Sequence, residues 1–218
     1  MTVAAFFDMD HTVLSNSSGR LYLKYLMQTG RLSWWRWANI TRLVAAYAVG
    51  LLDFPHLMSR LMVYAAREDE AATWRLSEQW FSDMLQHYIA PAACDRIAWH
   101  RTQGHHVAIV SAATPYAVKL VAEALGCGDA YLATRLEVID GKFTGAVIEP
   151  ACYGTGKVTL AKAYARQRDL DLGGSYFYSD SSSDLPLLEA VGHPVAVNPS
   201  RKLHKIAIAR QWPVVRFY

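Results

Sequence analysis

Short runs of apolar residues recur along the chain, and each run stops at a polar residue or a glycine. Five runs have the length of a buried strand, which carries few polar residues when both faces of its sheet are covered. They lie at positions 3–7, 107–110, 175–178, 194–197 and 214–217. From the second run to the last, segments with helical spacing separate the strands. Alternating strands and helices predict a parallel sheet covered on both faces.

The segment 14–88 has a different pattern. It is rich in Leu, Ala, Met, Arg, Trp and Tyr at helical spacing and contains few strand signals. Ser33 is a candidate N-cap for a long helix, and two more helices are expected at about 55–67 and 68–87. The second half of the first helix, 43–52, is apolar all round, which predicts burial on several sides. With no strand between them, these helices form a predicted insertion.

These patterns predict an α/β fold with two parts. Residues 1–13 and 89–218 form a Rossmann-like core with a parallel sheet, and residues 14–88 form an inserted α-helical cap domain. A hairpin is expected over 136–148, because the turn Asp140-Gly141 stands between two apolar runs. The turn sequence Asp-Gly is a strong hairpin signal in that context.

Composition narrows the class of protein. The chain is 52% hydrophobic and 19% charged, which is typical of a globular protein. Its net charge is only +3, and no dense Lys/Arg stripe predicts nucleic-acid binding. The scattered Cys94, Cys127 and Cys152, together with a start that lacks a basic leader, favour reduced thiols and a cytoplasmic location. The longest apolar run has ten residues, whereas a membrane-spanning helix needs roughly 20, so we expect no such helix.

Two carboxylates end the first strand, at Asp8 and Asp10. Residues two apart on a strand point to the same face, so both acids are expected to border one small volume. Two close carboxylates repel unless a cation or a shared proton separates them, and Mg²⁺ with oxygen ligands is the natural occupant. The alternative is an ordinary loop, since Asp is common where strands end. Ser111 and Asp180 also follow predicted strands and should share the same rim of the sheet.

Four elements occur in order along the chain: Asp8-x-Asp10-x-Thr12, Ser111 after an apolar strand, Lys157 opening a helix, and Asp180-x-x-x-Asp184. This set resembles the haloacid dehalogenase (HAD) superfamily. The helical insertion directly after the first motif resembles subfamily IB, which includes phosphoserine phosphatase. The segment from Ser179 to Glu189 is particularly similar to bacterial members of that subgroup.

The resemblance implies a phosphatase that works through an aspartyl-phosphate. Asp8 would be the nucleophile, and Asp10 would protonate the leaving oxygen and then deprotonate the attacking water. Mg²⁺ would bind Asp8, the backbone carbonyl of Asp10, and Asp180. Asp184 would support the metal from a second layer, and Thr12 would steady the first loop.

The remaining positions would hold the phosphate group. By the same resemblance, Ser111 and the amide of Ala112 would bind phosphate oxygens, and Lys157 would supply a fixed positive charge. Each has an ordinary alternative: Ser111 alone could be a helix N-cap, and Lys157 alone a solvated lysine. Asp180 and Asp184 alone could be a cap and a surface acid. The shared order of all the motifs favours one common site.

Departures from the family pattern bear on the substrate. His11 stands where the superfamily often has glycine. Ser17 stands nine residues after Asp8, where phosphoserine phosphatases have a glutamate that meets the substrate ammonium, so phosphoserine specificity is in doubt. The end of the chain, from Tyr178 to Pro213, also resembles histidinol-phosphate phosphatases. The expected substrate is therefore a small phosphate ester, phosphoserine-like or histidinol-phosphate-like.

The insertion should act as a cap that excludes water and shapes the leaving-group pocket. Its tryptophans, Trp34, Trp35 and Trp37, are expected either in the interior of the cap or on a surface for an apolar leaving group or a membrane interface. An alternative substrate is thus a phospholipid-derived or other apolar phosphate ester. Candidate cap contacts to substrate are Arg20, Arg36 and Arg42.

Other classes of protein explain the motifs less well. A phospho-accepting receiver domain would also be α/β with clustered acids, but it would be roughly half as long and would carry adjacent acids on its first strand. A dehalogenase would lack the second aspartate, which is Asp10 here, and would need no metal. A catalytically dead binding module would have lost a motif position, and none is lost.

Overall fold

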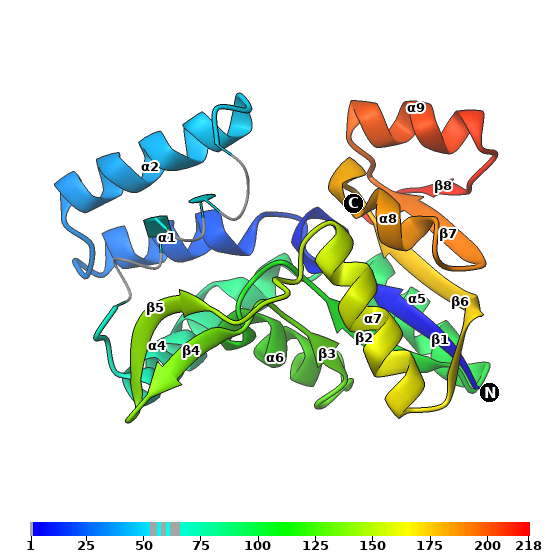
Figure 1. The fold of residues 1–218 in the computed structure, drawn as a ribbon, viewed down its shortest axis with the longest axis horizontal. Coiled ribbons are helices and arrows are strands. Elements are labelled where there is room, and N and C mark those ends of the chain that lie inside the picture. Colours follow the sequence, from blue (N-terminus) through cyan, green and yellow to red (C-terminus); the bar gives the residue numbers. More distant parts are fainter. Residues whose placement is uncertain (1, 53–55, 58–59, 62–65) are drawn as a thin grey trace.

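The computed structural model describes residues 2–52, 56–57, 60–61 and 66–218. Its centre is a six-stranded sheet in the order β3-β2-β1-β6-β7-β8, in which every neighbouring pair is parallel. The strands are β1 (Thr2–Phe7), β2 (His106–Val110), β3 (Tyr131–Leu132), β6 (Leu170–Ser179), β7 (His193–Val197) and β8 (Val214–Val215). The predicted parallel sheet is therefore confirmed, with β1 beside its centre (Figure 1).

Helices cover both faces of this sheet. They are α5 (Pro91–Thr102), α6 (Pro115–Ala124), α7 (Thr155–Gln167), α8 (Leu185–Leu188) and α9 (Arg201–Ala209). Ala5 and Phe7 of β1 pack in a core with residues of α5 and α6, whereas Ala4 and Phe6 pack in a second core with residues of α7, α8 and α9. Because both faces are covered, β1 is a continuous apolar run rather than an alternating one.

Two strand segments were missed by the sequence pattern. The two-residue strand β3 is too short to produce a periodic signal. Strand β6 begins five residues earlier than expected, and the unexpected part contains Gly173 and Gly174. Glycine weakens a strand pattern because it has no side chain to pack.

The insertion contains the helices α1 (Ser18–Gln28), α2 (Trp34–Ala48) and α4 (Glu70–Asp83), followed by the short turn η2 (Leu85–Tyr88). Ser33 is the N-cap of α2 as predicted, and its hydroxyl accepts from the amide of Arg36 at 3.4 Å. The helix ends at Ala48, before Gly50 with its φ of +77°, rather than at position 52. The helix expected at about 55–67 falls largely outside the described residues.

The expectation that 43–52 is buried on several sides is wrong. Helix α2 contacts α1 and buries Ile40, but many of its residues are exposed to solvent. Val49 and Leu51 are 72% and 79% exposed. An apolar sequence shows which residues prefer burial, but it does not supply a neighbour to bury them.

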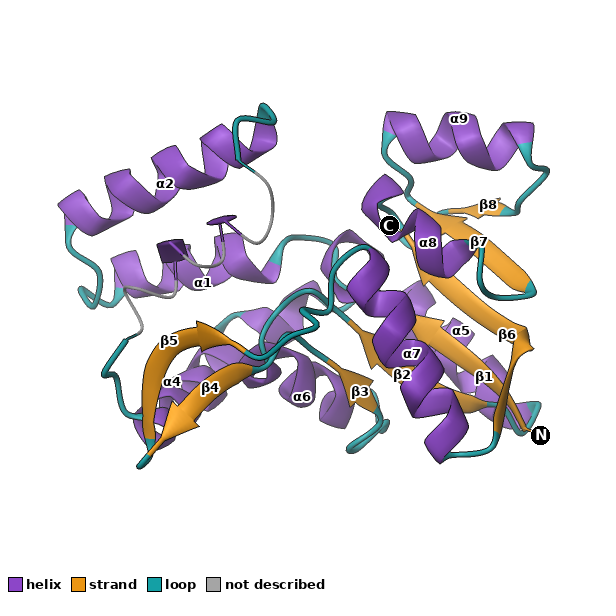
Figure 2. Ribbon diagram, in the orientation of Figure 1, coloured by secondary structure: helices purple, strands orange, loops and turns teal. Residues whose placement is uncertain are grey.

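The predicted hairpin is confirmed as β4 (Leu136–Ile139) and β5 (Lys142–Val147), which form a separate antiparallel sheet (Figure 2). Its backbone bonds to the insertion: the amide of Glu70 donates to the carbonyl of Gly141 at 2.9 Å. The side chain of Tyr116 on α6 also donates to Glu70, at 2.9 Å. The insertion therefore contacts both the hairpin and the core.

Within the described residues, no helix combines the length and the apolar character needed to cross a membrane. Cys94, Cys127 and Cys152 are all free thiols.

Candidate active site

Three neighbouring strands end in polar residues at one edge of the sheet. Asp8 follows β1, Ser111 follows β2 and Asp180 follows β6. Because β1 lies between β2 and β6 in parallel pairing, all three residues emerge at the carboxyl edge. Ligands in open α/β sheets bind at this edge. The fold thus brings these residues to one rim, as the sequence predicts.

The chain turns sharply after Asp8, over Met9–Val13 (η1). His11 has φ of +56°, in the left-handed region that favours glycine. The hydroxyl of Tyr218 donates to the carbonyl of His11 at 3.0 Å. The fully buried Thr12 donates its hydroxyl to Oδ2 of Asp8 at 3.5 Å, so Thr12 restrains the carboxylate that precedes it.

Lys157 joins two buried carboxylates. It is the third residue of α7, and its Nζ donates to Oδ1 of Asp8 at 2.6 Å and to Oδ2 of Asp184 at 2.7 Å. All three side chains are buried. The hydroxyl of Ser179, at the end of β6, also donates to Oδ2 of Asp184 at 2.7 Å. This network fixes Lys157 beside Asp8 across 149 positions of sequence.

The pKa values at this edge reflect burial first and the balance of charge second. Burial raises the pKa of Asp8 well above its ordinary value; Lys157 opposes this rise, and the charges of Asp184 and Asp180 add to it. For Lys157, burial lowers the pKa, but the neighbouring Asp184 and Asp8 outweigh burial and raise it. The lysine therefore stays charged, while one cation serves several carboxylates.

Asp10 lies outside this network. Residues at the start of the insertion hold it in place. Its Oδ1 accepts from the amide of Ser18 at 3.0 Å, and its Oδ2 accepts from the hydroxyl of Ser17 at 3.4 Å. Burial raises the pKa of Asp10, and the bonds from Ser18 and Ser17 oppose that rise. Ser17 is also the N-cap of α1. The serine at position 17 thus positions Asp10 and offers no charge to a substrate.

The pKa of Asp180 is also raised. Burial, with the charge of Asp184 added, raises the pKa of Asp180 to about 7, and Lys157 opposes the rise. Its carbonyl accepts from the amide of Ser200 at 2.9 Å, which anchors the loop after β6. A second cation near Asp180 would favour its ionised form.

The loop after β2 contributes Ser111 and its neighbours. Ser111 is buried, and its hydroxyl accepts from the amide of Ala113 at 3.1 Å. Helix α6 begins later, at Pro115 after the N-cap Thr114, so Ser111 is not the N-cap of that helix. The amide of Ala112 lies between these groups in sequence and stays a predicted phosphate ligand.

The donor set at this edge suits a hard divalent cation. Lys157 pairs with Asp8 and Asp184, and Asp180 and Asp10 add further carboxylates at the same edge. Among the described residues, no three His, Cys, Asp or Glu side chains already stand in a metal-binding arrangement. The predicted set, however, needs only the carboxylates of Asp8 and Asp180 with the carbonyl of Asp10. Oxygen donors with excess negative charge fit Mg²⁺.

The three candidate arginines of the insertion stay predicted cap contacts. Arg20, Arg36 and Arg42 are all exposed, and in the part of the chain that is described no ion pair joins them to the acids of the site. A different residue links the insertion to this edge: the hydroxyls of Tyr47 on α2 and Tyr153 are 2.9 Å apart. Neither tyrosine has a local sequence signal, because the contact depends on the path of α2 over the core.

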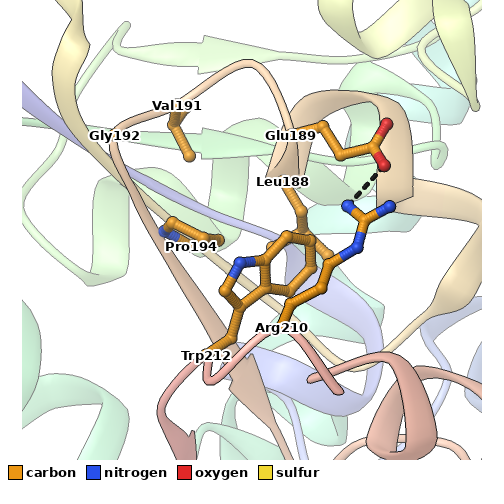
Figure 3. A pocket seen from close by; sticks show the side chains of 7 residues that line it. All are labelled: Leu188, Glu189, Val191, Gly192, Pro194, Arg210 and Trp212. Atoms are coloured by element: carbon orange, nitrogen blue, oxygen red, sulfur yellow. Dashed lines mark ion pairs between the residues drawn. The ribbon is translucent and has the colours of Figure 1, made fainter. Parts of the chain in front are cut away.

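A hollow of about 460 Å³ lies near the end of the sheet formed by β7 and β8, away from these residues. Figure 3 shows Arg210 paired with Glu189 and lying beside Trp212 at its mouth. None of the predicted catalytic residues lines it. The candidate active site is therefore the strand edge and not this hollow.

Comparison with known proteins points to one family. The model of the haloacid dehalogenase-like hydrolases matches residues 5–189. A probable phosphatase of Mycobacterium tuberculosis is 37% identical, over 98% of this chain and 75% of its own length. A histidinol-phosphatase of Neisseria meningitidis is 28% identical, over 98% of each chain. A crystal structure described as a phospho-aspartyl intermediate analogue of phosphoserine phosphatase has a TM-score of 0.71, at 19% identity over 100% of this chain and 94% of that one, which shows a shared fold.

Proposed function

The chain belongs to the haloacid dehalogenase-like hydrolase family, and we propose that it is a Mg²⁺-dependent phosphomonoesterase that works through an aspartyl-phosphate on Asp8. Its similarity over nearly its whole length to proteins named as phosphatases places it among the phosphatases of this family. The supporting observation is the bond from Lys157 to Asp8 at 2.6 Å, deep in the carboxyl edge. It puts a fixed cation beside the proposed nucleophile.

Different residues of this chain have different roles in phosphoryl transfer. Oδ2 of Asp8 attacks phosphorus, while Lys157 holds Oδ1 and stabilises the negative charge on the phosphoryl oxygens. Thr12 and the left-handed turn at His11 keep the carboxylate pointed out of the strand end. Ser111 and the amide of Ala112 bind the remaining phosphoryl oxygens.

Asp10 gives a proton to the leaving oxygen and then takes a proton from the attacking water. Because burial raises its pKa, Asp10 keeps a proton closer to neutral pH than a solvated aspartate does, and it can protonate the leaving oxygen. Once ionised, it can deprotonate the water that attacks the aspartyl-phosphate. Ser17 and Ser18 hold its carboxyl group in one orientation during both steps.

Mg²⁺ would be held by Asp8, the carbonyl of Asp10, and Asp180, and would supply charge neutralisation for the transferring phosphoryl group. Asp184 would hold Lys157 in place from behind. The insertion 14–88 would act as the cap over this edge, through contacts such as that of Tyr47 with Tyr153.

The proposed substrate is a small polar phosphate ester of the histidinol-phosphate or phosphoserine type. The full-length similarity to a histidinol-phosphatase supports this class. Phosphoserine is expected to be the poorer substrate, because Ser17 is bonded to Asp10 and cannot pair with an ammonium group. A reducing, cytoplasmic setting is proposed from the three free thiols.

A phosphatase assay tests the proposal. The purified protein should hydrolyse p-nitrophenyl phosphate with Mg²⁺, lose the activity in EDTA and regain it when Mg²⁺ is restored. A panel of histidinol phosphate, phosphoserine, sugar phosphates and lysophospholipid phosphates should then favour the polar esters. Activity that is indifferent to EDTA would refute the metal assignment, and a preference for the lipid ester would refute the polar substrate class.

A further inference from the structure

The charge of this protein is unevenly distributed along the chain. Residues 11–52 contain five Lys or Arg residues and no Asp or Glu. They therefore carry +5, although the whole chain carries only +3, so the rest of the chain carries −2. The cations of this segment are Arg20, Lys24, Arg31, Arg36 and Arg42, and all of them are exposed.

The same segment exposes large apolar side chains. Trp34 and Trp35, at the start of α2, are 59% and 74% exposed, and Val49 and Leu51 at its other end are more than two-thirds exposed. Tryptophan is a costly residue to leave in water at such a fraction, because burying an aromatic side chain is worth about 1.5–3 kcal/mol. Such a concentration of exposed apolar side chains on one helix and its C-terminal flank is typical of an interaction surface.

Three exposed residues fall on one line along α2 and its C-cap. Trp35, Arg42 and Val49 are seven positions apart, which is close to two helical turns, so they project from the same side. The opposite side of the helix carries the buried Ile40 and also Tyr47, whose hydroxyl meets that of Tyr153. Figure 1 shows α2 as the outermost element of this lobe. We call the side that carries Trp34, Trp35, Arg42 and Val49 the outer face of α2.

We propose that the outer face of α2 docks on the surface of an anionic phospholipid membrane, with the helix lying in the plane of the interface. Tryptophan and aliphatic side chains would enter the boundary between headgroups and acyl chains, and the arginines would pair with lipid phosphates. With 15 residues, α2 is about 22 Å long and its exposed apolar groups stand at both ends, as suits a helix that lies flat.

Charge decides between a membrane and a second copy of this chain. A symmetric dimer through the outer face would bring together Arg42 and the neighbouring Arg31 and Arg36 of two copies, and segment 11–52 has no carboxylate to pair with them. An anionic lipid surface supplies the missing negative charge, worth about 1 kcal/mol for each Lys or Arg near the surface. The occupant that fits both the apolar and the cationic groups is therefore lipid.

Co-sedimentation of the full chain with vesicles tests this surface. We expect binding to vesicles of phosphatidylcholine with phosphatidylglycerol, and little binding to phosphatidylcholine alone. The double variant Trp35→Ser/Val49→Ser and the variant Arg31→Glu should each weaken binding by about tenfold or more, and added salt should weaken the wild type. None of these positions lies in the catalytic network, so hydrolysis of soluble p-nitrophenyl phosphate verifies that each variant is folded.

Two controls match the variants in chemistry but lie elsewhere. Ile139→Ser removes an exposed apolar side chain from the hairpin, and Arg166→Glu reverses an exposed charge near the end of α7. Both should bind anionic vesicles like the wild type. No binding to anionic vesicles, or equal losses in variants and controls, would overturn the proposal. A concentration-dependent dimer that Trp35→Ser/Val49→Ser dissociates would assign the face to a second copy instead.

Discussion

The carboxyl edge of the sheet and the outer face of α2 differ in the sign of their charge and in its burial. At the edge, the buried Lys157 pairs with the buried Asp8 and Asp184, and Asp180 adds another carboxylate nearby. On α2 and its flanks, the cations are exposed and no carboxylate is present. The edge has an excess of negative charge inside the protein, and the insertion has an excess of positive charge outside it.

This difference shows which charges determine geometry. A buried ion pair that loses one partner leaves an uncompensated charge, at a cost of about 3–5 kcal/mol, so each member is held in place by the others. An exposed charge is screened by water and contributes about 0–1 kcal/mol to stability. Substitutions at the edge should therefore have large effects on catalysis and stability, and substitutions on α2 should have small ones.

The largest effect is expected for the proposed nucleophile. Asp8→Asn should lower kcat/KM for p-nitrophenyl phosphate by at least about 10⁴-fold, because the amide cannot attack phosphorus. Circular dichroism should show that the fold persists. The control Asp129→Asn alters an exposed aspartate and should leave the rate unchanged. Residual activity within tenfold of the wild type would refute the role of Asp8.

Lys157→Met should lower kcat by about 10²–10³-fold, in line with the loss of one preorganised charge at a transition state. It should also destabilise the protein, since Asp8 and Asp184 would remain buried without their cation. Urea unfolding measures the stability, with Lys162→Met as an exposed control on the same helix. Wild-type stability in Lys157→Met would show that the ion pairs do not form in solution.

Asp180→Asn should change stability and activity in opposite directions. The pKa of Asp180 is raised to about 7 in the folded protein, above the ordinary value of 3.8. Between those values the folded state binds a proton that the unfolded state does not, so Asp180 increasingly destabilises the metal-free protein as pH rises from about 4 to about 7, and the penalty then stays constant. The variant should therefore melt at a higher temperature than the wild type at pH 8, and the two should converge near pH 4.

The response to Mg²⁺ completes that prediction. Mg²⁺ should raise the melting temperature of the wild type at pH 8 and less so at pH 6, where Asp180 is largely protonated. Asp180→Asn should lose both this response and the Mg²⁺-dependent turnover. Equal stabilisation of wild type and variant by Mg²⁺ would remove Asp180 from the metal site.

The smallest effect is expected on the insertion. Arg36→Ala should change kcat/KM for a soluble ester by less than about twofold and the unfolding free energy by less than about 0.5 kcal/mol, since the side chain is exposed. A tenfold loss of kcat/KM would show instead that the insertion closes over the substrate and that Arg36 contacts it.

The same contrast separates what the sequence could predict from what it could not. The sheet and its rim followed from apolar runs that end in Asp8, Ser111 and Asp180, because strand order places such ends together. The burial of 43–52 was predicted wrongly, because apolar periodicity does not reveal whether a neighbour covers the helix. The contact of Tyr47 with Tyr153 was missed because it depends on tertiary placement alone.

The most direct test is to locate the phosphoryl group during turnover. The wild-type enzyme is quenched with acid while it hydrolyses substrate, reduced with borohydride and digested for peptide mass spectrometry. Reduction converts an aspartyl-phosphate to homoserine, and we predict homoserine at position 8, dependent on both substrate and Mg²⁺ and absent from Asp8→Asn. Homoserine at another aspartate, or phosphate on a histidine, would contradict the assignment of Asp8 as the nucleophile.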